Sequence, residues 1–445
     1  MKKAMRIFTM LLALTMVFTL FTGCGSNTKV SEPAAKETAK KEEAKTETPA
    51  KKVKIKFAAW DTTLAGNEFK VVVDNFNKQS KTTEVEIIDA SGKDFQDKLN
   101  ISLAGGDDID VYGIKDMPQY SSHITKKQVL ALDDLIKKDG FDISPYGKGL
   151  DVLKVDGKTL ALPFRSDFWI LFYNKDLFDK AKLPYPTADM TWDQYRELAK
   201  KLTSGEGNDK VWGSFFHTWL SCTNNLMIAQ GKNTMIDGKY DFLKPAYDLR
   251  LNLEQVDKSQ MAYASIKSTN SHYRTMFESG KVAMLPMATF FIGTMISEKK
   301  AGKHNVNWGI TKLPHFADGK SGDSVFNYTP VAINAGTKNR DAAWEFMRYL
   351  CGEPGALTIA KLGVMPAYST KNVLDTYSSI EGFPADGKPA LESPNAFIEF
   401  PVHKNAAQIS KAIDEEAQMI LIKSKNIDDG LKAMETKVKD LIGSK

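Results

Sequence analysis

The chain has 445 residues, 42% of them hydrophobic and 26% charged, and its formal net charge is +5 at pH 7. This composition is typical of a globular protein, and the small net charge predicts no nucleic-acid surface. The three cysteines lack the spacing of a metal site and are too few for disulfides to be the main stabilising feature. No cofactor is expected.

The first 23 residues have the pattern of an export signal. Three basic side chains precede an uncharged apolar stretch over residues 7–21, which is too short for a comfortable membrane span. Residues 20–24, LFTGC, resemble a bacterial lipobox, with Phe21 in place of the usual leucine. The resemblance implies cleavage before Cys24 and a lipid on its sulfur. The alternative is an ordinary secretory signal with a free cysteine, and both alternatives export the protein.

Residues 24–52 are predicted to be a flexible tether. Lys, Glu, Ala, Thr and Pro dominate this stretch, as in AAKETAKKEEAKTETPAKK, and such a composition cannot bury enough apolar surface to fold. Loss of the signal removes three positive charges from the net charge of +5, which leaves +2. The remaining body, from about residue 53, is long enough for two domains.

The body opens with alternating strand and helix patterns. Strands are predicted over residues 53–57, 84–88 and 109–112, and helices over residues 68–76 and 95–103. Such a β-α-β-α-β run favours a mostly parallel sheet with helices on both faces. Ligands of such sheets bind beyond the carboxyl ends of the strands, which here are Trp60-Asp61 and Lys115-Asp116.

The next segment contains an interruption that predicts a crossing between two lobes. An apolar strand precedes residues 163–167, and a second apolar strand follows them up to Tyr173. Further along, Thr191 and Gln194 form a capping-box pattern that predicts a helix to about residue 202. Helices are also predicted over residues 219–230, 247–255, 271–279, 341–350 and 406–441, the last with a break at Gly430, and strands over residues 282–285, 308–310 and 331–334. The last two strands are expected to return to the first sheet.

Seven motifs follow one another along the body: ISLAGGDDIDVYG, ALPFRSDFWILFYNKDLF, TWDQYRELAKKL, FESGKVAML, WGITKLP, VAINAGTKNRDAAWEFMRYL and GVMPA. In this order they resemble the maltodextrin-type, or multiple-sugar, group of bacterial extracellular solute-binding proteins. The resemblance implies an α/β, two-lobed periplasmic-binding-protein-like fold. Each lobe would be a mostly parallel sheet flanked by helices, and hinge crossings would let the lobes close on the ligand.

The resemblance also implies lobe boundaries. By position, the first lobe would comprise residues 53–164 and 288–345, and the second lobe residues 165–287 and 346–445. The crossings would lie near residues 164–167, 287–290 and 346–350.

A sugar site needs aromatic rings that stack on C–H faces and polar groups that satisfy hydroxyls. Both kinds of residue occur where the resemblance places the cleft. The candidate ligand-binding residues are Trp60, Asp61, Asp116, Arg165, Asp167, Trp219, Asn224, Phe290, Phe291 and Tyr328.

Several of these candidates have a structural alternative. Trp60 and Phe290 could be core aromatics, and Asp61 could cap the helix that follows its strand. Arg165 and Asp167 could form a structural bridge across the crossing instead of contacting a hydroxyl.

The sequence and the resemblance together predict a substrate-binding lipoprotein that captures a mono- or oligosaccharide and delivers it to the permease subunits of an ABC-type importer. The protein is expected to act as a monomer outside the cytoplasm, held to the cell membrane only by lipid on Cys24. One alternative is a binding protein for a non-sugar solute, such as a phosphorylated polyol, a polyamine or a peptide. Another is a surface adhesin that serves no importer.

No enzyme is expected. The chain lacks the nucleophile-elbow, metalloprotease and phosphate-loop motifs, and its six histidines share no ligand spacing. Two carboxylates in a cleft, such as Asp61 and Asp167, could imitate a glycosidase pair, so a glycosidase is the enzyme alternative.

Overall fold

The computed structural model describes residues 51–64, 66–392 and 395–443. The predicted signal, Cys24 and nearly all of the predicted tether lie outside these residues. The described residues form one compact unit. Within the part of the chain that is described, no helix combines the length and the apolar character needed to cross a bilayer.

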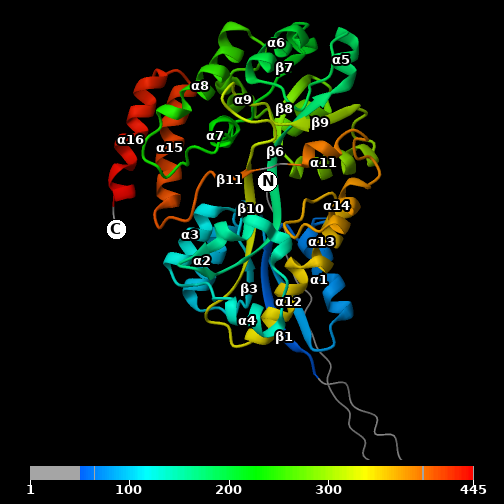
Figure 1. Ribbon diagram of the computed structural model, residues 1–445, viewed down its shortest axis with the longest axis vertical. Coiled ribbons are helices and arrows are strands. Elements are labelled where there is room, and N and C mark those ends of the chain that lie inside the picture. Colours follow the sequence, from blue (N-terminus) through cyan, green and yellow to red (C-terminus); the bar gives the residue numbers. More distant parts are fainter. Residues whose placement is uncertain (1–50, 65, 393–394, 444–445) are drawn as a thin grey trace, which may run out of the picture. The chain divides into compact units, whose positions relative to one another are not determined.

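The core of this unit is a mixed β-sheet whose strands come from distant parts of the sequence (Figure 1). Its order is β2 (Thr83–Ala90), β1 (Val53–Trp60), β3 (Val111–Gly113), β10 (Ser324–Ile333), β6 (Leu162–Asn174), β8 (Val282–Ala288) and β7 (Trp212–Ser214), with β9 (Trp308–Lys312) also paired to β6 and β11 (Ala396–Phe397) to β10. Strand β1 is parallel to β2 and β3, as the opening pattern predicts. The sheet as a whole is mixed because β10 is antiparallel to β3 and β6, and β6 is antiparallel to β8 and β9.

Two lobes are built on the two halves of this sheet (Figure 1). The first lobe carries β1, β2 and β3 with α1 (Glu68–Gln79), α2 (Phe95–Gly105), α3 (Met117–Thr125), α4 (Asp133–Asp139), α12 (Arg340–Cys351) and α13 (Glu353–Ala360). The second carries β7, β8 and β9 with α5 (Lys175–Ala181), α6 (Trp192–Leu202), α7 (Ser221–Ile228), α8 (Lys244–Leu251), α9 (Tyr263–Thr269), α10 (Tyr273–Glu278), α11 (Phe290–Lys300), α15 (Ala406–Leu421) and α16 (Ile427–Gly443). Helix α14 (Lys371–Ser378) packs against α13. The predicted two-lobed α/β fold is confirmed.

The predicted interruption at residues 163–167 is wrong, because β6 is one continuous strand of 13 residues. Pro163 lies opposite Pro330 of β10, at a shift in register. Neither proline has an N–H, so ladder bonds are lost from both strands at the same place and pairing resumes on either side. Residues 162–168 of β6 pair with β10 and residues 169–174 pair with β8, so the strand itself carries the chain from one lobe to the other.

The predicted crossing near residues 164–167 lies in β6, which carries the chain between the lobes, but the two other predicted crossings are wrong. Residues 287–288 pair with β6 at the end of β8, and Phe346 in α12 packs on Phe57 of the first lobe with ring centroids 5.2 Å apart. Strand β10 makes the second crossing instead.

Strand β9 differs from its prediction as well, because it pairs with residues 170–174 of β6 in the second lobe. An apolar pattern indicates that a strand exists, but its partner depends on the rest of the fold.

Local sequence signals predicted one helix boundary correctly and another wrongly. The Thr191 hydroxyl accepts from the Gln194 N–H and the Gln194 side chain accepts from the Thr191 N–H, which confirms the capping box. The predicted break at Gly430 is wrong, because the chain turns over residues 422–426 and Gly430 lies inside α16. A Cβ at Gly430 would come within 2.2 Å of the Ile420 side chain, so this glycine allows α15 and α16 to pack closely.

Candidate functional site

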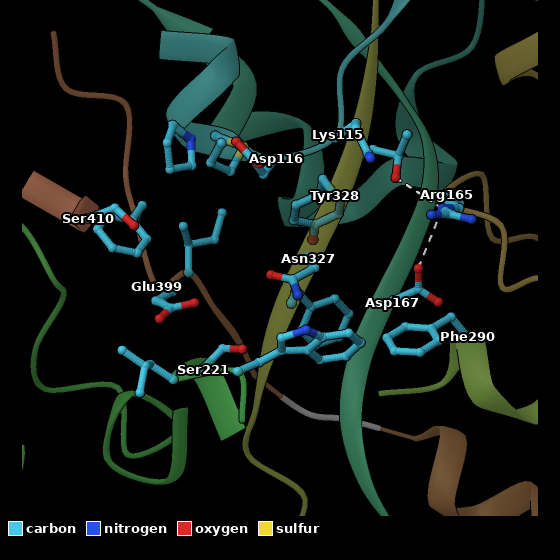
Figure 2. Close-up of a pocket in the computed structure, with 18 of the residues that line it drawn as sticks. Lys115, Asp116, Arg165, Asp167, Ser221, Phe290, Asn327, Tyr328, Glu399 and Ser410 are labelled. Atoms are coloured by element: carbon cyan, nitrogen blue, oxygen red, sulfur yellow. Dashed lines mark hydrogen bonds and ion pairs between the residues drawn. The ribbon is translucent and has the colours of Figure 1, made fainter. Parts of the chain in front are cut away.

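A cavity of about 400 Å³ lies beside the central part of β6 and β10. Its walls come from both lobes: the start of α3, the two crossing strands, the turn before α7, the start of α11, residues 398–400 and α15 (Figure 2). The lining includes the aromatic residues Trp219, Phe290, Phe326, Tyr328 and Phe400, the acids Asp116, Asp167, Glu399 and Asp414, the cations Lys115 and Arg165, and the neutral polar residues Ser221, Asn327, Thr329 and Ser410. The volume lies within the range of roughly 300–1,000 Å³ that small-ligand pockets occupy.

Six of the ten predicted ligand-binding residues line this cavity. They are Asp116, Arg165, Asp167, Trp219, Phe290 and Tyr328. These residues are distant in sequence and meet where β6 and β10 pass between the lobes. Asp116 at one predicted strand end and Arg165 and Asp167 at the first predicted crossing therefore lie around one space, whereas the other predicted strand end does not reach it.

Two predicted aromatic residues lie in the core instead. Trp60 packs edge-on against Phe69, with ring centroids 4.9 Å apart, inside the first lobe. Phe291 is fully buried and packs on Phe172 at 5.1 Å. It follows Phe290 directly in α11, and neighbouring helical residues point about 100° apart, so only one of the two rings faces the cavity.

Asp61 and Asn224 also lie outside the cavity, because other groups already use their side chains. The Asp61 carboxylate accepts a hydrogen bond from the Gly92 N–H at 2.7 Å and so ties together the loops after β1 and β2. Asp61 does not cap α1, since Asn67 does. Asn224 is buried and accepts a hydrogen bond from the Tyr247 hydroxyl at 3.0 Å.

Trp219 offers an exposed ring to the cavity. It lies just before α7, and 42% of its surface is accessible. Its ring centroid is 6.2 Å from Phe290, 5.3 Å from Tyr273 and 4.8 Å from His217. An indole held in place by neighbouring rings provides a flat apolar surface on which a ligand can stack.

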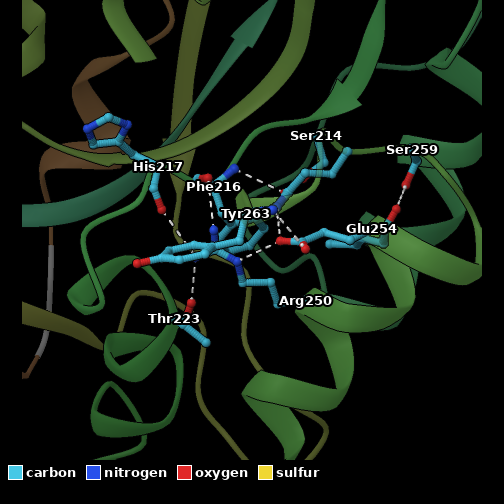
Figure 3. Close-up of polar contacts among 10 residues, drawn as sticks. Ser214, Phe216, His217, Thr223, Arg250, Glu254, Ser259 and Tyr263 are labelled. Atoms are coloured by element: carbon cyan, nitrogen blue, oxygen red, sulfur yellow. Dashed lines mark hydrogen bonds and ion pairs between the residues drawn. The ribbon is translucent and has the colours of Figure 1, made fainter. Parts of the chain in front are cut away.

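A buried ion pair holds the segment that leads to Trp219 (Figure 3). The Arg250 guanidinium donates to the Glu254 carboxylate at 2.9 Å. It also donates to the backbone carbonyls of His217 at 3.1 Å and Phe216 at 3.3 Å. Arg250 has no exposed surface, so these bonds are shielded from water. The ion pair therefore connects α8 to the backbone that positions the Trp219 ring.

Arg165 connects α1 of the first lobe to the two crossing strands at one side of the cavity (Figure 2). Its guanidinium lies 2.6 Å from the Glu68 carboxylate and 3.6 Å from the Asp167 carboxylate, and it donates to the Thr329 hydroxyl at 3.0 Å. Burial raises the pKa of Asp167 to about 6, although Arg165 and a hydrogen bond from Thr289 oppose this rise. The structural bridge considered from the sequence is therefore present, and both of its members also line the cavity.

Sequence reasoning named Lys115 only as part of a strand end, and it did not single out Glu399 or Asp414. The Lys115 ammonium donates to the Gly92 carbonyl and lies 5.5 Å from the Trp60 ring centroid. Burial raises the pKa of Glu399 to about 8 and that of Asp414 to about 6. Helical spacing places Ser410 and Asp414 on one face of α15, but it does not show what that face contacts.

Among the residues that the structure describes, no three His, Cys, Asp or Glu side chains are placed to hold a metal ion together. Cys222 and Cys351 are buried free thiols. The chemistry available to a ligand is therefore that of rings, hydroxyls, amides and carboxylates, together with two cations that already have partners.

A ligand-sized cavity between two lobes that share crossing strands defines a two-lobed binding protein. The chain belongs to the family of bacterial extracellular solute-binding proteins, whose family model matches residues 59–356. The predicted membership in this family is confirmed, and the family places the protein's site of action outside the cytoplasm.

Solved structures with the same fold include two bacterial transport proteins. A sugar transporter of Rhizobium etli, solved in an open conformation, is 39% identical, with a TM-score of 0.79 over 87% of this chain and 99% of that chain. An ABC substrate-binding protein of Listeria monocytogenes, in complex with cycloalternan, is 22% identical, with a TM-score of 0.75 over 89% of this chain and 100% of that chain. The second likeness concerns the fold alone.

The curated relatives include proteins with a different ligand. An sn-glycerol-3-phosphate-binding periplasmic protein of Brucella abortus is 28% identical over 194 residues, which is 41% of this chain and 43% of that protein. The chain thus matches less than half the length of this relative. A protein of the same name from Pectobacterium atrosepticum is 24% identical over 384 residues, which is 80% of this chain and 83% of that protein.

Proposed function

We propose that this protein captures a mono- or oligosaccharide in the cavity between its lobes and delivers it to the permease subunits of an ABC-type importer. The lining of the cavity carries this proposal. Aromatic rings occur there together with carboxylate, amide and hydroxyl groups. A sugar has apolar C–H faces that stack on rings and hydroxyl groups that need planar polar partners, so this combination suits it.

The same lining disfavours a phosphorylated polyol, which is the ligand named for the Brucella and Pectobacterium relatives. A phosphate group needs free cations or free backbone amides. Arg165 is already paired with Glu68 and Asp167, and the Lys115 ammonium with the Gly92 carbonyl. Four acids face the same space, and in their ionised form they repel an anion.

The likeness to the Rhizobium etli sugar transporter supports a carbohydrate ligand, because the identity of 39% extends over nearly all of that chain. We further propose that the protein is not an enzyme and that its cavity acids accept hydrogen bonds from ligand hydroxyls. Ligand-dependent closure of the lobes would then present one joined surface to the importer.

The crossing strands suggest which parts of the body move as units. We propose a first lobe of residues 53–164 and 330–378, and a second lobe of residues 168–323 and 396–443. Strands β6 and β10 would act as the hinge, since they are the strands shared by both halves of the sheet. The proposed boundaries replace those predicted from the resemblance, which cut through β8 and α12.

We propose that the exported protein begins at a lipid-modified Cys24 and acts as a monomer tethered to the cell membrane. Replacement of Cys24 with Ser should move the protein from the membrane fraction to the soluble extracytoplasmic fraction, because the lipid would be its only attachment. Replacement of the buried Cys222 with Ser is the matched control and should leave the protein in the membrane fraction. A membrane-bound Cys24→Ser protein would contradict the lipid anchor.

The carbohydrate proposal is tested by a thermal-shift screen. The panel contains neutral mono- and disaccharides, amino sugars, glycerol 3-phosphate, polyamines and short peptides. A ligand that binds only the folded state must raise the melting temperature, so at least one sugar should raise it by several degrees. A rise with glycerol 3-phosphate, a polyamine or a peptide, and with no sugar, would contradict the carbohydrate proposal but not the assignment as a solute-binding protein.

A further inference from the structure

The charged groups of the cavity are unevenly distributed (Figure 2). At the β6 end, Asp167 is paired with Arg165. At the other end, the carboxylates of Asp116, Glu399 and Asp414 line the cavity near the contact between α3 and α15, and we call these three residues the acidic recess. In the described part of the chain, no Lys or Arg forms an ion pair with Glu399 or Asp414. Burial raises the pKa of Asp116, although the hydrogen bond from the Gln119 N–H and the nearby Lys115 oppose this rise.

Three separate segments build the acidic recess. Asp116 caps α3 by accepting a hydrogen bond from the Gln119 N–H at 2.8 Å. Asp414 lies on α15, one turn after Ser410, and both side chains line the cavity. The backbone carbonyl of Glu399 accepts a hydrogen bond from the Met235 N–H at 2.9 Å, which anchors its segment to the second lobe. The recess is thus formed by ordered parts of both lobes.

A buried amide lies next to the recess. Asn225 of α7 has no exposed surface and does not line the cavity. A hydrogen bond between its side chain and the Glu399 carboxylate opposes the rise in that pKa, and the described residues offer the amide no other partner. An amide N–H that donates to a carboxylate favours the ionised form of the carboxylate, which is the form that an amine would pair with.

The other titratable neighbours of Glu399 supply no positive charge. Tyr247 of α8 and Cys222 of α7 lie close to it, and burial raises the pKa of each above its usual value, so both are neutral at pH 7. Burial and the proximity of Asp414 and Asp116 disfavour ionisation of Glu399 when the cavity is empty. A cation that enters the recess would offset this repulsion, whereas a neutral hydroxyl would not.

We propose that the acidic recess of Glu399, Asp414 and Asp116 binds a protonated amine of the ligand, so that the solute is an amino sugar or a related amine-bearing polyol. The inference rests on the proposed carbohydrate function and narrows it. In this arrangement the Trp219 ring supports an apolar face of the ligand while the amine lies in the recess.

The test compares matched sugars by isothermal titration calorimetry on the full exported chain. Each set contains a free amine, an N-acetylated amine and a hydroxyl at the same carbon, in the gluco, galacto and manno configurations and as β-1,4-linked disaccharides. In at least one set the free amine should bind about tenfold or more tightly than its hydroxyl counterpart. The Glu399→Gln variant keeps the size of the side chain and removes its ability to ionise, so it should weaken binding of the amine at least about fivefold more than binding of the hydroxyl sugar.

Two further variants complete the design. Asp414→Asn should reduce the amine preference in the same direction, and it provides a second measurement if Glu399→Gln folds poorly. Glu415→Gln is the matched control, because Glu415 neighbours Asp414 on α15 but pairs with Lys437 at 2.8 Å outside the cavity. This control should leave the affinity of every sugar unchanged.

Each outcome separates this inference from the function on which it rests. Equal or tighter binding of the hydroxyl or N-acetyl member in every set that binds, or an amine preference that persists in both recess variants, overturns the amine site and leaves the carbohydrate proposal standing. Absence of binding by every sugar overturns the carbohydrate proposal and the amine site together. An amine preference that is lost in the recess variants and kept in Glu415→Gln supports both.

Discussion

The Arg250→Met variant is expected to lose about 3–5 kcal/mol of its free energy of unfolding, because removal of one member of a buried ion pair leaves the other charge without a partner. The charge left unpaired would be that of Glu254, whose side chain is as buried as that of Arg250. The substitution would also remove the donors that satisfy the carbonyls of Phe216 and His217. Urea unfolding followed by tryptophan fluorescence measures the loss.

A double substitution distinguishes the stability lost through an unpaired buried charge from the stability lost through poorer packing. In Arg250→Met with Glu254→Gln, the residue at 254 can still accept from the Tyr263 N–H, as Glu254 does at 3.1 Å, but it carries no charge. The double variant should therefore be more stable than Arg250→Met alone. Arg348→Met is the matched control, since Arg348 is half exposed and its bridge to Asp139 should contribute at most about 1 kcal/mol.

A loss in Arg250→Met no larger than that in Arg348→Met would contradict the role of the ion pair in holding this region. So would a double variant less stable than the single one. Because the ion pair holds the backbone before Trp219, Arg250→Met should also weaken ligand binding under conditions in which it remains folded.

The Trp219→Ala variant is expected to bind its sugar tenfold or more weakly than the parent chain and to remain folded. The indole is 42% exposed, so its removal takes little from the core. One lost ring contact with a ligand costs about 1.5 kcal/mol, which corresponds to about a tenfold change in the dissociation constant. Calorimetric titration with the sugar found in the thermal-shift screen measures the change.

Trp212→Ala is the matched control for this experiment. Trp212 is also a partly exposed indole, but it lies on β7 beside Lys210 and does not line the cavity. Its loss should leave sugar affinity within about twofold of the parent, since no ligand contact is removed. An unchanged affinity in Trp219→Ala, or an equal loss in both variants, would remove Trp219 from the binding site.

Much of the fold could be predicted because its signals are local. Alternating apolar residues indicated β1 and β2, and the Thr191 and Gln194 pair indicated the start of α6. Local signals failed where a distant segment decided the outcome. Pro163 predicted an interruption, but β6 continues through it opposite Pro330. Gly430 predicted a helix break, but it lies inside α16, where its lack of a side chain leaves room for Ile420.

The candidate site was predictable to the extent that it lies at strand ends and crossings. Asp116 at a strand end and Arg165 at a crossing follow this rule and line the cavity. Trp60 follows the same rule but packs on Phe69, because the position of a residue on a strand does not determine which neighbours its side chain meets. Glu399 could not be found in this way, since it lies in an irregular segment that reaches the cavity only after the chain has passed through both lobes.

The amino-acid order was enough to indicate export, two α/β lobes and a cleft with rings and polar groups, since these depend on composition and on periodicity over a few turns or strands. The tertiary structure alone decided the long-range features. These are the continuous hinge strand β6, the ion pair of Arg250 and Glu254 behind Trp219, and the gathering of Asp116, Glu399 and Asp414. Side chains up to about 300 residues apart affect each other's ionisation and orientation only when folding brings them together and excludes water, and no local pattern records that.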